Sequence, residues 1–543
     1  MVAIISNVQQ RDMRVFEIIT HLGQQSIRKI AESLKISASR VQRSINALSK
    51  RDCCPESYFW ETKEGYEWLQ KLVYCVMLEF GLKGNQGADR MSAFFNRINI
   101  NHRIGVSATA LRTKMKRMEE CLIQYQSLHE QEQAASGSTQ EIIAGGDETF
   151  FREYMLLVLM DLGSGYILLE EEAPNRSYDT WHEKSKKSLE SLNLRVRHFI
   201  SDRGKSLIKL ALSGFCCEAG ADLFHAQYDI SKWLGTGLGR KISQAQTQLK
   251  KAKEALFSLQ KRKTSSQKIE HKEQELKEHE SILNKLKKGQ ELYSDALRKV
   301  SEILHPFSTE TLTSTTSCQV ESLLKEQSEE FKKIADDHNI NDNKNRCNKY
   351  TKQIIDMASG IDSWWLWVIE SITGYELGKK KQDWLIYTLL PVIYWHQKME
   401  KTQNSKMKKV YKVAWKKALF LYENHSISHE ISAVEKEQWL SWADWISMKF
   451  QRTSSAIEGR NGYLSQMHHN GRGITANRLK ALTVIHNYDT RRKNGTTAAE
   501  RLFDKKIPDM FDWLIGQMGD LPLPRKARGR KSYNPLNLQI VSA

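Results

Sequence analysis

Cysteine is scarce in this sequence, and long apolar runs are absent. The eight cysteines among 543 residues include two adjacent pairs, Cys53–Cys54 and Cys216–Cys217, and no CxxC spacing. This pattern argues against a zinc ribbon and against a disulfide framework. The longest apolar run, residues 384–395, contains a proline and is too short to span a bilayer. Because the first residues also lack the order of a signal peptide, we expect a cytoplasmic protein with no membrane partner.

Acidic residues are outnumbered by basic ones. The chain has 64 Asp and Glu against 82 Lys and Arg, which gives a formal net charge of +18. Such a field attracts polyanions, and nucleic acid is the commonest large polyanion, although a basic balance can also serve solubility alone. The length allows several domains, because single cores rarely grow beyond ~250–300 residues. We therefore expect a multidomain protein with a nucleic-acid partner.

A helix-turn-helix pattern lies near the start of the chain. Residues 26–34 have apolar side chains at helical spacing, and a short turn leads to a second helical pattern at residues 38–51. The second helix has an apolar face of Val41, Ile45 and Leu48 and an opposite polar face. The second helix of such a motif enters the major groove, so we expect Arg40, Gln42 and Arg43 to meet base edges. An ordinary helical hairpin is the alternative.

A second basic helix is predicted at residues 106–122. It carries Arg112, Lys114, Lys116 and Arg117, and it is either a second DNA-binding unit or a solvated helix. The helical DNA-binding region then covers residues 1–127. The polar, weakly patterned residues 128–140 are predicted to be a linker.

The character of the sequence changes after the linker. Residues 141–150, 154–173 and 194–201 are apolar runs of strand length, and a Gly-Ser-Gly turn makes the middle run a hairpin. A helical pattern stands between the hairpin and the last strand. This order predicts a mixed α/β sheet within an α+β multidomain protein.

Helical patterns dominate from residue 236 onward. Two heptad runs separated by a break at residues 264–266 predict an antiparallel coiled coil of two helices. Tryptophan-rich helices are predicted at residues 363–372 and 439–450. Tryptophans at this spacing are typical of a helical core.

Two aspartates stand where the predicted sheet would bring them together. Asp202 ends one strand and opens a helix, and Asp147 lies in the first strand just after two glycines. Asp202 could be a simple cap, and Asp161 could replace Asp147 if the strand register differs. Two adjacent carboxylates repel each other unless a cation lies between them, and Mg²⁺ prefers oxygen ligands. The pair therefore indicates a metal site.

A third carboxylate would complete a site for two-metal displacement of a phosphodiester. The candidate is Glu458, in the sequence FQRTSSAIEGRNGYLSQMHHNGRG at residues 450–473. Arg452, Arg460 and Asn461 flank it and suit a substrate phosphate.

Residues 141–230 and 450–505 resemble the catalytic core of DDE-type insertion-sequence transposases, which has an RNase H-like fold. The resemblance is carried by GGDETFFREYMLLVLMDLGSGYILLEEEA, HFISDRGKSLIKLA, RTSSAIEGRNGYLSQ and NGTTAAERLF. It implies a catalytic triad of Asp147, Asp202 and Glu458 that holds two Mg²⁺ or Mn²⁺ ions. Many relatives place a Lys or Arg about two turns after the Glu, whereas Ser465 and Gln466 precede His468–His469 here, so Arg460 and Arg472 are the expected substitutes.

The resemblance also implies a domain plan. The core would comprise residues 141–235 and 441–510, interrupted by a helical insertion at 236–440 and followed by a basic tail at 511–543. Residues 222–234 resemble the fifth strand and its following helix. Within them His225 is either a substrate contact or a core histidine, and Asp229 is a weaker carboxylate candidate. The segment PRKARGRK at 524–531 would contact phosphates without reading sequence.

The function implied is that of a DNA transposase. It would bind the terminal inverted repeats of its element and catalyse Mg²⁺-dependent strand cleavage and strand transfer, with Arg203 and Lys205 as further DNA contacts. Its partners would be double-stranded DNA, both element ends and target, and a second copy of the chain, since cutting two ends needs at least a dimer. We expect it on the nucleoid of a bacterial-type cytoplasm. A nuclease without strand transfer and a non-catalytic DNA-binding regulator are the alternatives.

Overall fold

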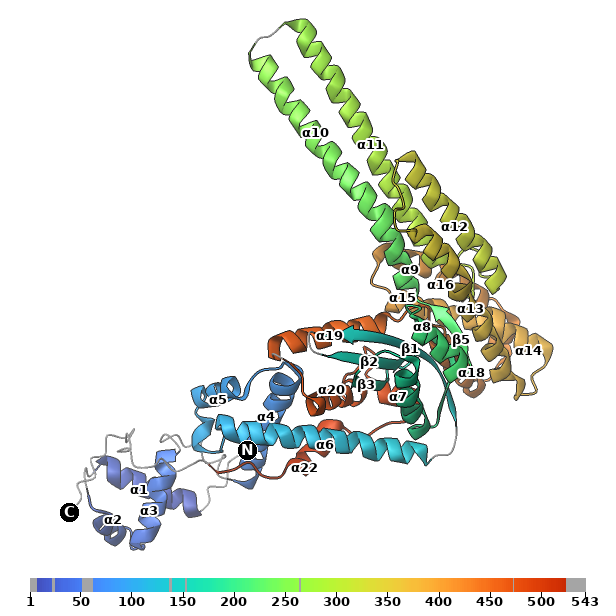
Figure 1. Ribbon diagram of the computed structural model, residues 1–543. Helices are drawn as coiled ribbons and strands as arrows, with labels where there is room; N and C mark the ends of the chain where they lie inside the picture. The colour runs from blue at the N-terminus through green and yellow to red at the C-terminus, as the bar shows by residue number, and fades with distance from the viewer. Residues whose placement is uncertain are drawn as a thin grey trace. The chain divides into compact units, whose positions relative to one another are not determined.

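The computed structural model describes residues 7–21, 25–50, 62–135, 139–151, 154–262, 265–471 and 473–523. The chain, drawn in Figure 1 with its helices and strands labelled, divides by its internal contacts into two compact units. The first comprises Met1–Ser127, Gln466–Ile485 and Pro508–Ala543, and the second comprises Leu128–Ser465 and His486–Ile507. The last part of the predicted core is therefore shared, because its residues 466–485 belong to the first unit.

The first unit begins with three short helices around one apolar core. They are α1 (Asn7–His21), α2 (Ile27–Ser33) and α3 (Ala38–Lys50). Their buried residues are Val15, Ile30, Ala31, Val41 and Leu48. The Ser26 hydroxyl accepts the Lys29 N–H and caps α2, as a serine at this position commonly does. The structure thus has both helices of the predicted helix-turn-helix, with α1 as a third helix packed on α3.

The rest of the first unit is a helical bundle. It contains α4 (Lys63–Val76), the π-helical η2 (Met77–Lys83), α5 (Ala88–Arg97), η3 (Ile100–His102), most of α6 (Ala108–Ala134) and α22 (Met510–Met518). Helix α6 contains the second predicted basic helix, and its residues Leu111 and Met118 are fully buried. Residues 128–134, predicted as part of a linker, are instead the end of α6. Their leucine, glutamates, glutamines and alanine are good helix formers, which a reading for polarity overlooks.

The second unit is built on one mixed sheet of five strands. These are β1 (Gln140–Phe150), β2 (Met155–Asp161), β3 (Ile167–Ala173), β4 (Leu194–Ser201) and β5 (Glu218–Ala221), in the order β3-β2-β1-β4-β5. The β1–β2 and β2–β3 pairs are antiparallel, whereas β1–β4 and β4–β5 are parallel. The predicted mixed sheet is confirmed, and α7 (Tyr178–Ser191) is the helix expected between β3 and β4.

The predicted fifth strand is misplaced. Residues 222–234 lie in α9 (Leu223–Ile230) and the π-helical η5 (Ser231–Gly235), and the strand precedes them. Asp222 is the N-cap of α9, where its carboxylate accepts the Phe224 N–H at 2.7 Å. The true fifth strand, β5, is only four residues long. It is separated from β4 by α8 (Lys205–Lys209) and the π-helical η4 (Leu210–Gly214).

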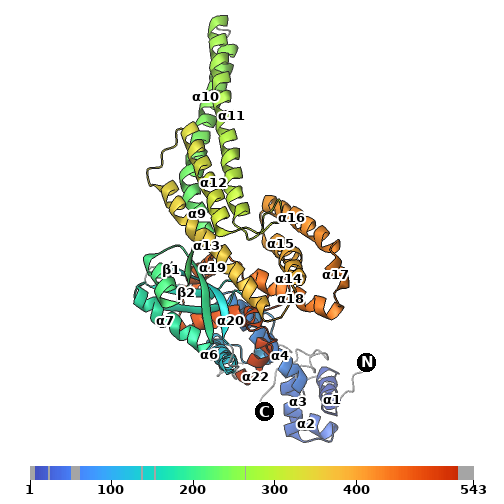
Figure 2. The ribbon, with the colours of Figure 1, turned by 90° about the vertical axis from the view of Figure 1, so that its right-hand side faces the viewer.

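A long helical region follows the sheet. Helices α10 (Thr236–Lys261) and α11 (Ser266–Ile303) form the expected hairpin, with a buried seam of Ile242, Ala245, Leu283 and Leu286 (Figure 1). Further helices follow along the chain, and Figure 2 shows them beside the base of the hairpin. They are α12 (Ser317–Asp337), α13 (Arg346–Thr373), α14 (Lys379–Trp384), η6 (Leu385–Leu389), α15 (Leu390–Lys401), α16 (Ser405–Glu423), α17 (Ser426–Glu430) and α18 (Ala433–Met448). The chain then continues as α19 (Ser455–Gly471), α20 (Ala476–Tyr488) and α21 (Ala498–Phe503).

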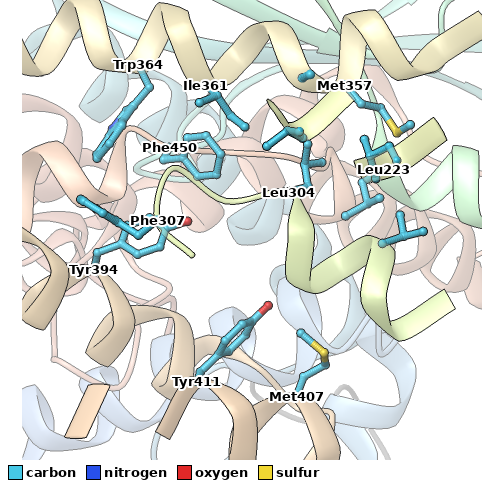
Figure 3. Packing of buried hydrophobic residues seen from close by; sticks show 14 of the residues in the cluster. Leu223, Leu304, Phe307, Met357, Ile361, Trp364, Tyr394, Met407, Tyr411 and Phe450 are labelled. Atoms are coloured by element: carbon cyan, nitrogen blue, oxygen red, sulfur yellow. The ribbon is translucent and has the colours of Figure 1, made fainter. Parts of the chain in front are cut away.

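One apolar core joins the sheet to the helical region. It includes Ile143 and Ile200 of the sheet, Trp364 and Tyr394 of the helices, and Phe450 of the segment between α18 and α19. Figure 3 shows part of this packing, in which Trp364, Phe450 and Phe307 lie close together. The predicted tryptophan core is present, since Trp364, Trp367 and Trp439 are buried. Among the described helices, none combines the length and apolar character that crossing a membrane requires.

Candidate functional site

The centre of β1 is built for close packing on both of its faces. A Cβ at Gly146 would lie 2.7 Å from the Phe199 ring, and a Cβ at Gly145 would lie 3.0 Å from the Ile457 side chain. Ile457 is on α19, so the absence of a side chain at Gly145 lets this helix approach the strand. Asp147 follows directly, and α19 therefore passes beside it.

The pairing of β1 with β4 brings two of the predicted carboxylates to one level. Gly145 pairs with Ile200 across the two parallel strands. Asp147 and Asp202 each lie two residues further in the same direction, at the same end of the strand pair. The side-by-side placement expected from the sequence is thus present in the backbone register.

The segment that leads into α19 is tied to the end of β5. The Asp222 carboxylate accepts the backbone N–H of Ser454 at 3.2 Å and also the Ser454 hydroxyl. The Leu223 N–H donates to the Arg452 carbonyl at 3.1 Å. These bonds fix the start of α19, on whose first turn Glu458 stands.

Two of the predicted carboxylates, Glu458 and Asp202, act on the third, Asp147. The pKa of Asp147 is raised to about 7, first by burial and then by the negative charges of Glu458 and Asp202. Asn461, one turn after Glu458, donates its amide N–H to Asp147 Oδ2 at 2.8 Å. The charged groups that move the Asp147 pKa, Glu458, Asp202 and Glu148, are all acidic. We call Asp147, Asp202 and Glu458 the acidic cluster.

Asp202 is both a cap and a member of the acidic cluster. Its side chain is exposed, and Oδ1 accepts the Gly204 N–H at 2.9 Å at the turn into α8. The same carboxylate raises the pKa of Asp147 and of Glu148. The two interpretations of Asp202 are therefore compatible.

Two further side chains lie beside the cluster: His225, for which the sequence left a substrate contact and a core histidine open, and Glu148, to which it assigned no role. His225 Nε2 lies 3.2 Å from Glu458 Oε1, and its side chain is 34% exposed, so it is not a core histidine. Glu148 accepts a hydrogen bond from Trp181 Nε1 at 3.2 Å, and burial raises its pKa. Residue type alone offered no signal for Glu148, because adjacent strand residues face opposite sides.

The chemistry of this donor set fits a divalent cation. Carboxylate oxygens are the preferred ligands of Mg²⁺, and like charges at one place favour a cation between them. Asn461 adds a buried amide oxygen, Oδ1, that accepts no hydrogen bond. Among the residues the structure describes, however, no three Asp, Glu, His or Cys side chains already lie close enough to hold a metal ion. The carboxylates approach one another without forming a preorganised coordination shell.

Two predicted DNA contacts are corrected by the structure. Arg460 donates from Nε and Nη2 to both oxygens of Glu170, at 2.7 and 2.6 Å, and the two side chains are 4% and 0% exposed. Arg452 donates from Nη1 to the Ser301 and Leu304 carbonyls at 2.6 and 3.0 Å. Both guanidinium groups are used inside the protein, so neither is available to a phosphate.

The other predicted DNA contacts of the second unit lie near the cluster. Arg203 has a left-handed backbone, with φ of 68°, and pairs with Asp356. Lys205 is exposed at the start of α8.

The two alternative carboxylates lie outside the cluster. Asp161, the alternative to Asp147, accepts the Ser164 N–H at 2.9 Å and closes the β2–β3 turn, so the geometry favours Asp147. Asp229 lies 3.6 Å from Arg346, in a separate ion pair.

The predicted DNA contacts of the first unit are mostly exposed. Arg40, Gln42 and Arg43 are all exposed on α3, and Gln42 Nε2 donates to Asn46 at 3.0 Å. On α6, Lys114 is used internally, since it donates to the Met518 carbonyl at 2.9 Å and burial lowers its pKa. The remaining basic residues of α6 that were predicted as contacts are exposed: Arg112, Lys116 and Arg117. Arg472 and the basic segment 524–531 lie outside the described residues.

Comparison with known proteins gives one partial match. Residues 385–530 match a family of unknown function, DUF6399. The matched stretch covers less than half of the chain. It begins at η6 and includes both α16 and Glu458. No curated protein and no solved structure gives a significant match.

Proposed function

We propose that the protein is a DNA transposase of the DDE type, whose RNase H-like core is interrupted by the helical region between β5 and α19. The observation that carries the proposal is the convergence of Asp147, Asp202 and Glu458 from three distant parts of the chain. The raised pKa of Asp147, with Glu458 and Asp202 among its causes, supports it. The resemblance to transposases singled out the same three residues.

The sheet and the first unit support the same proposal. The resemblance expects a first strand with one catalytic Asp and a fourth strand that brings the second Asp beside it. The β1–β4 pairing has that arrangement. The exposed Arg40, Gln42 and Arg43 on α3 suit recognition of the element's inverted repeats in the major groove.

The residues of the cluster would divide the work at a phosphodiester. Asp147, Asp202 and Glu458 would hold two Mg²⁺ or Mn²⁺ ions, and such ions would supply the Lewis acidity needed to activate an attacking water or 3′-hydroxyl and to stabilise a departing oxygen. Asn461 holds Asp147 in place through its amide N–H. His225, within 3.2 Å of Glu458, orients that carboxylate.

The experiment is a matched pair of aspartate substitutions. Full-length protein is incubated with Mg²⁺ and a plasmid that carries the inverted repeats flanking its gene. We expect Asp202→Asn to lower cleavage by about 10³-fold or more while end binding is kept, as removal of an essential catalytic group does. Asp229→Asn, which changes a carboxylate outside the cluster, is the control and should cleave like the parent.

The outcomes also separate the rival functions. Cleavage without strand-transfer products on a target plasmid would favour a nuclease of the same fold. End binding without any cleavage by the parent protein would favour a non-catalytic regulator. Equal cleavage by the parent and by Asp202→Asn would refute the assignment of the site. Light scattering with and without end DNA tests the proposed dimer.

A further inference from the structure

Helix α16 presents a lysine face to solvent. Its exposed lysines are Lys406, Lys408, Lys409, Lys412, Lys416 and Lys417. The sequence from 401 to 422 contains seven lysines and no acidic residue. The match to DUF6399 includes this helix but assigns nothing to it.

The lysine face has a defined geometry. The residues of α16 that are buried, Met407, Tyr411, Ala414 and Ala418, recur at helical spacing and face the core. Lys409, Lys412 and Lys416 follow the i, i+3, i+7 spacing on the opposite side, which places them in one row. At 1.5 Å rise per residue, the row is about 10 Å long.

The lysines of this face are not ion-paired with carboxylates in the part of the chain that the structure describes. Among the described residues, no ion pair joins any of the six lysines to an Asp or Glu. Lys417 donates to a backbone carbonyl, that of Glu310, at 3.0 Å. The hairpin of α10 and α11 differs, because Lys253 lies 3.2 Å from Glu280 and Lys250 lies 4.0 Å from Glu254. A solvated helix usually mixes both signs in that way.

The inner side of α16 is bonded to the segment that carries Glu458. Tyr411 Oη lies 3.0 Å from His305 Nε2 and accepts from Arg452 Nη2 at 3.4 Å. Arg452 precedes α19 by three residues, and its own carbonyl accepts the Leu223 N–H. Figure 3 shows Tyr411 and Met407 pointing from α16 into this interior. A polyanion on the outer side of α16 would therefore be held by an element fixed to the acidic cluster's third carboxylate.

We propose that the lysine face of α16 binds the phosphate backbone of duplex DNA without reading its sequence. The inference rests on the proposed function and deepens it, since it adds a contact for DNA flanking the reacting phosphodiester. A row of ammonium groups with one sign of charge complements a polyanion, and each phosphate contact releases condensed counterions. The exposed Val413, Phe420 and Leu421 of the same helix would suit an anionic membrane instead, which the experiment includes as an outcome.

The test measures how salt weakens binding of the full chain to random-sequence duplex DNA. The variant is Lys409→Gln/Lys412→Gln/Lys416→Gln. Loss of three phosphate contacts should reduce the slope of log K against log salt by about 2.7, at ~0.9 per contact. A second variant, Lys409→Arg/Lys412→Arg/Lys416→Arg, keeps the charge and should keep the slope. The matched control, Lys250→Gln/Lys251→Gln/Lys253→Gln on α10, removes the same charge and should leave the slope near that of the parent.

Each result decides the inference separately from the proposed function. An unchanged slope in the α16 variant overturns the inference, as does an equal fall in the α10 control, which would indicate net charge alone. Tighter binding of the parent to phosphatidylcholine–phosphatidylglycerol vesicles than to DNA, lost in the α16 variant, also overturns it. If the parent binds DNA and cleaves ends but the slopes are equal, the proposed function stands and the inference fails. If the parent does not bind DNA at all, both fail.

Discussion

Helix α19 carries two charged side chains only two positions apart, and their surroundings are opposite. Glu458 joins Asp147 and Asp202 in a cluster of like charges, and the pKa of Asp147 rises to about 7. Arg460 faces Glu170 in a buried pair with two hydrogen bonds, at 2.7 and 2.6 Å. On one side of the helix three carboxylates lie near one another, whereas on the other side the charge of Arg460 is neutralised by Glu170.

The difference separates the arrangement proposed to be functional from a structural one. A buried pair of opposite charges with good geometry satisfies both partners and asks for no ligand. Like charges held together are unfavourable in the free protein, and such strain is typical of a site that awaits a cation or substrate. Charged residues two positions apart on one helix are therefore not alike, and the comparison predicts different effects for substitutions on the two sides.

The largest effect on stability is expected on the paired side. Arg460→Met leaves Glu170 buried without this guanidinium, which should lower the free energy of unfolding by about 3–5 kcal/mol. The double variant Arg460→Met/Glu170→Leu should recover most of the loss, because it removes both charges. Urea denaturation followed by tryptophan fluorescence measures both. An Arg460→Met variant as stable as the parent would show that the pair is not what holds this side of α19.

The Arg460 case also indicates what the sequence could reveal. Residue 460 follows Glu458 closely in a segment that resembles a catalytic motif, so a basic side chain there was interpreted as a DNA contact. Its partner, Glu170, is separated from it by 290 positions, and only the three-dimensional fold brings the two together. By contrast, Asp147 and Asp202 could be paired from the sequence, because strand order alone sets their neighbours.

Local patterns were sufficient for elements with strong periodicity. The strands β1 to β4, the two helices of the helix-turn-helix and the α10–α11 hairpin all follow apolar spacing. The fifth strand was misplaced because Glu218–Ala221 has the sequence EAGA, which lacks the β-branched and aromatic residues typical of strands. The apolar residues after it belong to a helix. Short edge elements are set by pairing rather than by propensity.

Burial of Asp147 beside the charges of Glu458 and Asp202 should make stability depend on pH. The pKa of Asp147 rises from 3.8 to about 7 on folding, so the folded state binds a proton more tightly than the unfolded chain. The contribution of Asp147 to the free energy of unfolding should therefore be largest below pH 4, and it should fall as pH rises from about 4 to 7. The loss is at most about 4 kcal/mol by linkage.

The measurement compares melting temperatures of the parent and of Asp147→Asn over this pH range. Asn cannot ionise, so the variant should gain stability relative to the parent as pH increases, while its cleavage activity is lost. Asp229→Asn is again the control, and its pH profile should follow that of the parent. Parallel profiles for the parent and Asp147→Asn would mean that neither burial nor the neighbouring carboxylates raise the pKa of Asp147 in the folded protein.

The smallest effect, and the one that connects the comparison to function, is stabilisation by metal. If the acidic cluster binds Mg²⁺, the ion should raise the melting temperature at pH 8, where Asp147 is ionised. The free energy of unfolding should increase by about 2.7 kcal/mol when free Mg²⁺ reaches 100 times its dissociation constant. The gain should shrink toward pH 5, because protons compete for Asp147, and it should disappear in Glu458→Gln. The Arg460→Met/Glu170→Leu variant, altered on the opposite side of the same helix, should keep it. A Mg²⁺ response that survives in Glu458→Gln would place the ion elsewhere and would remove the physical basis for treating the two sides of α19 differently.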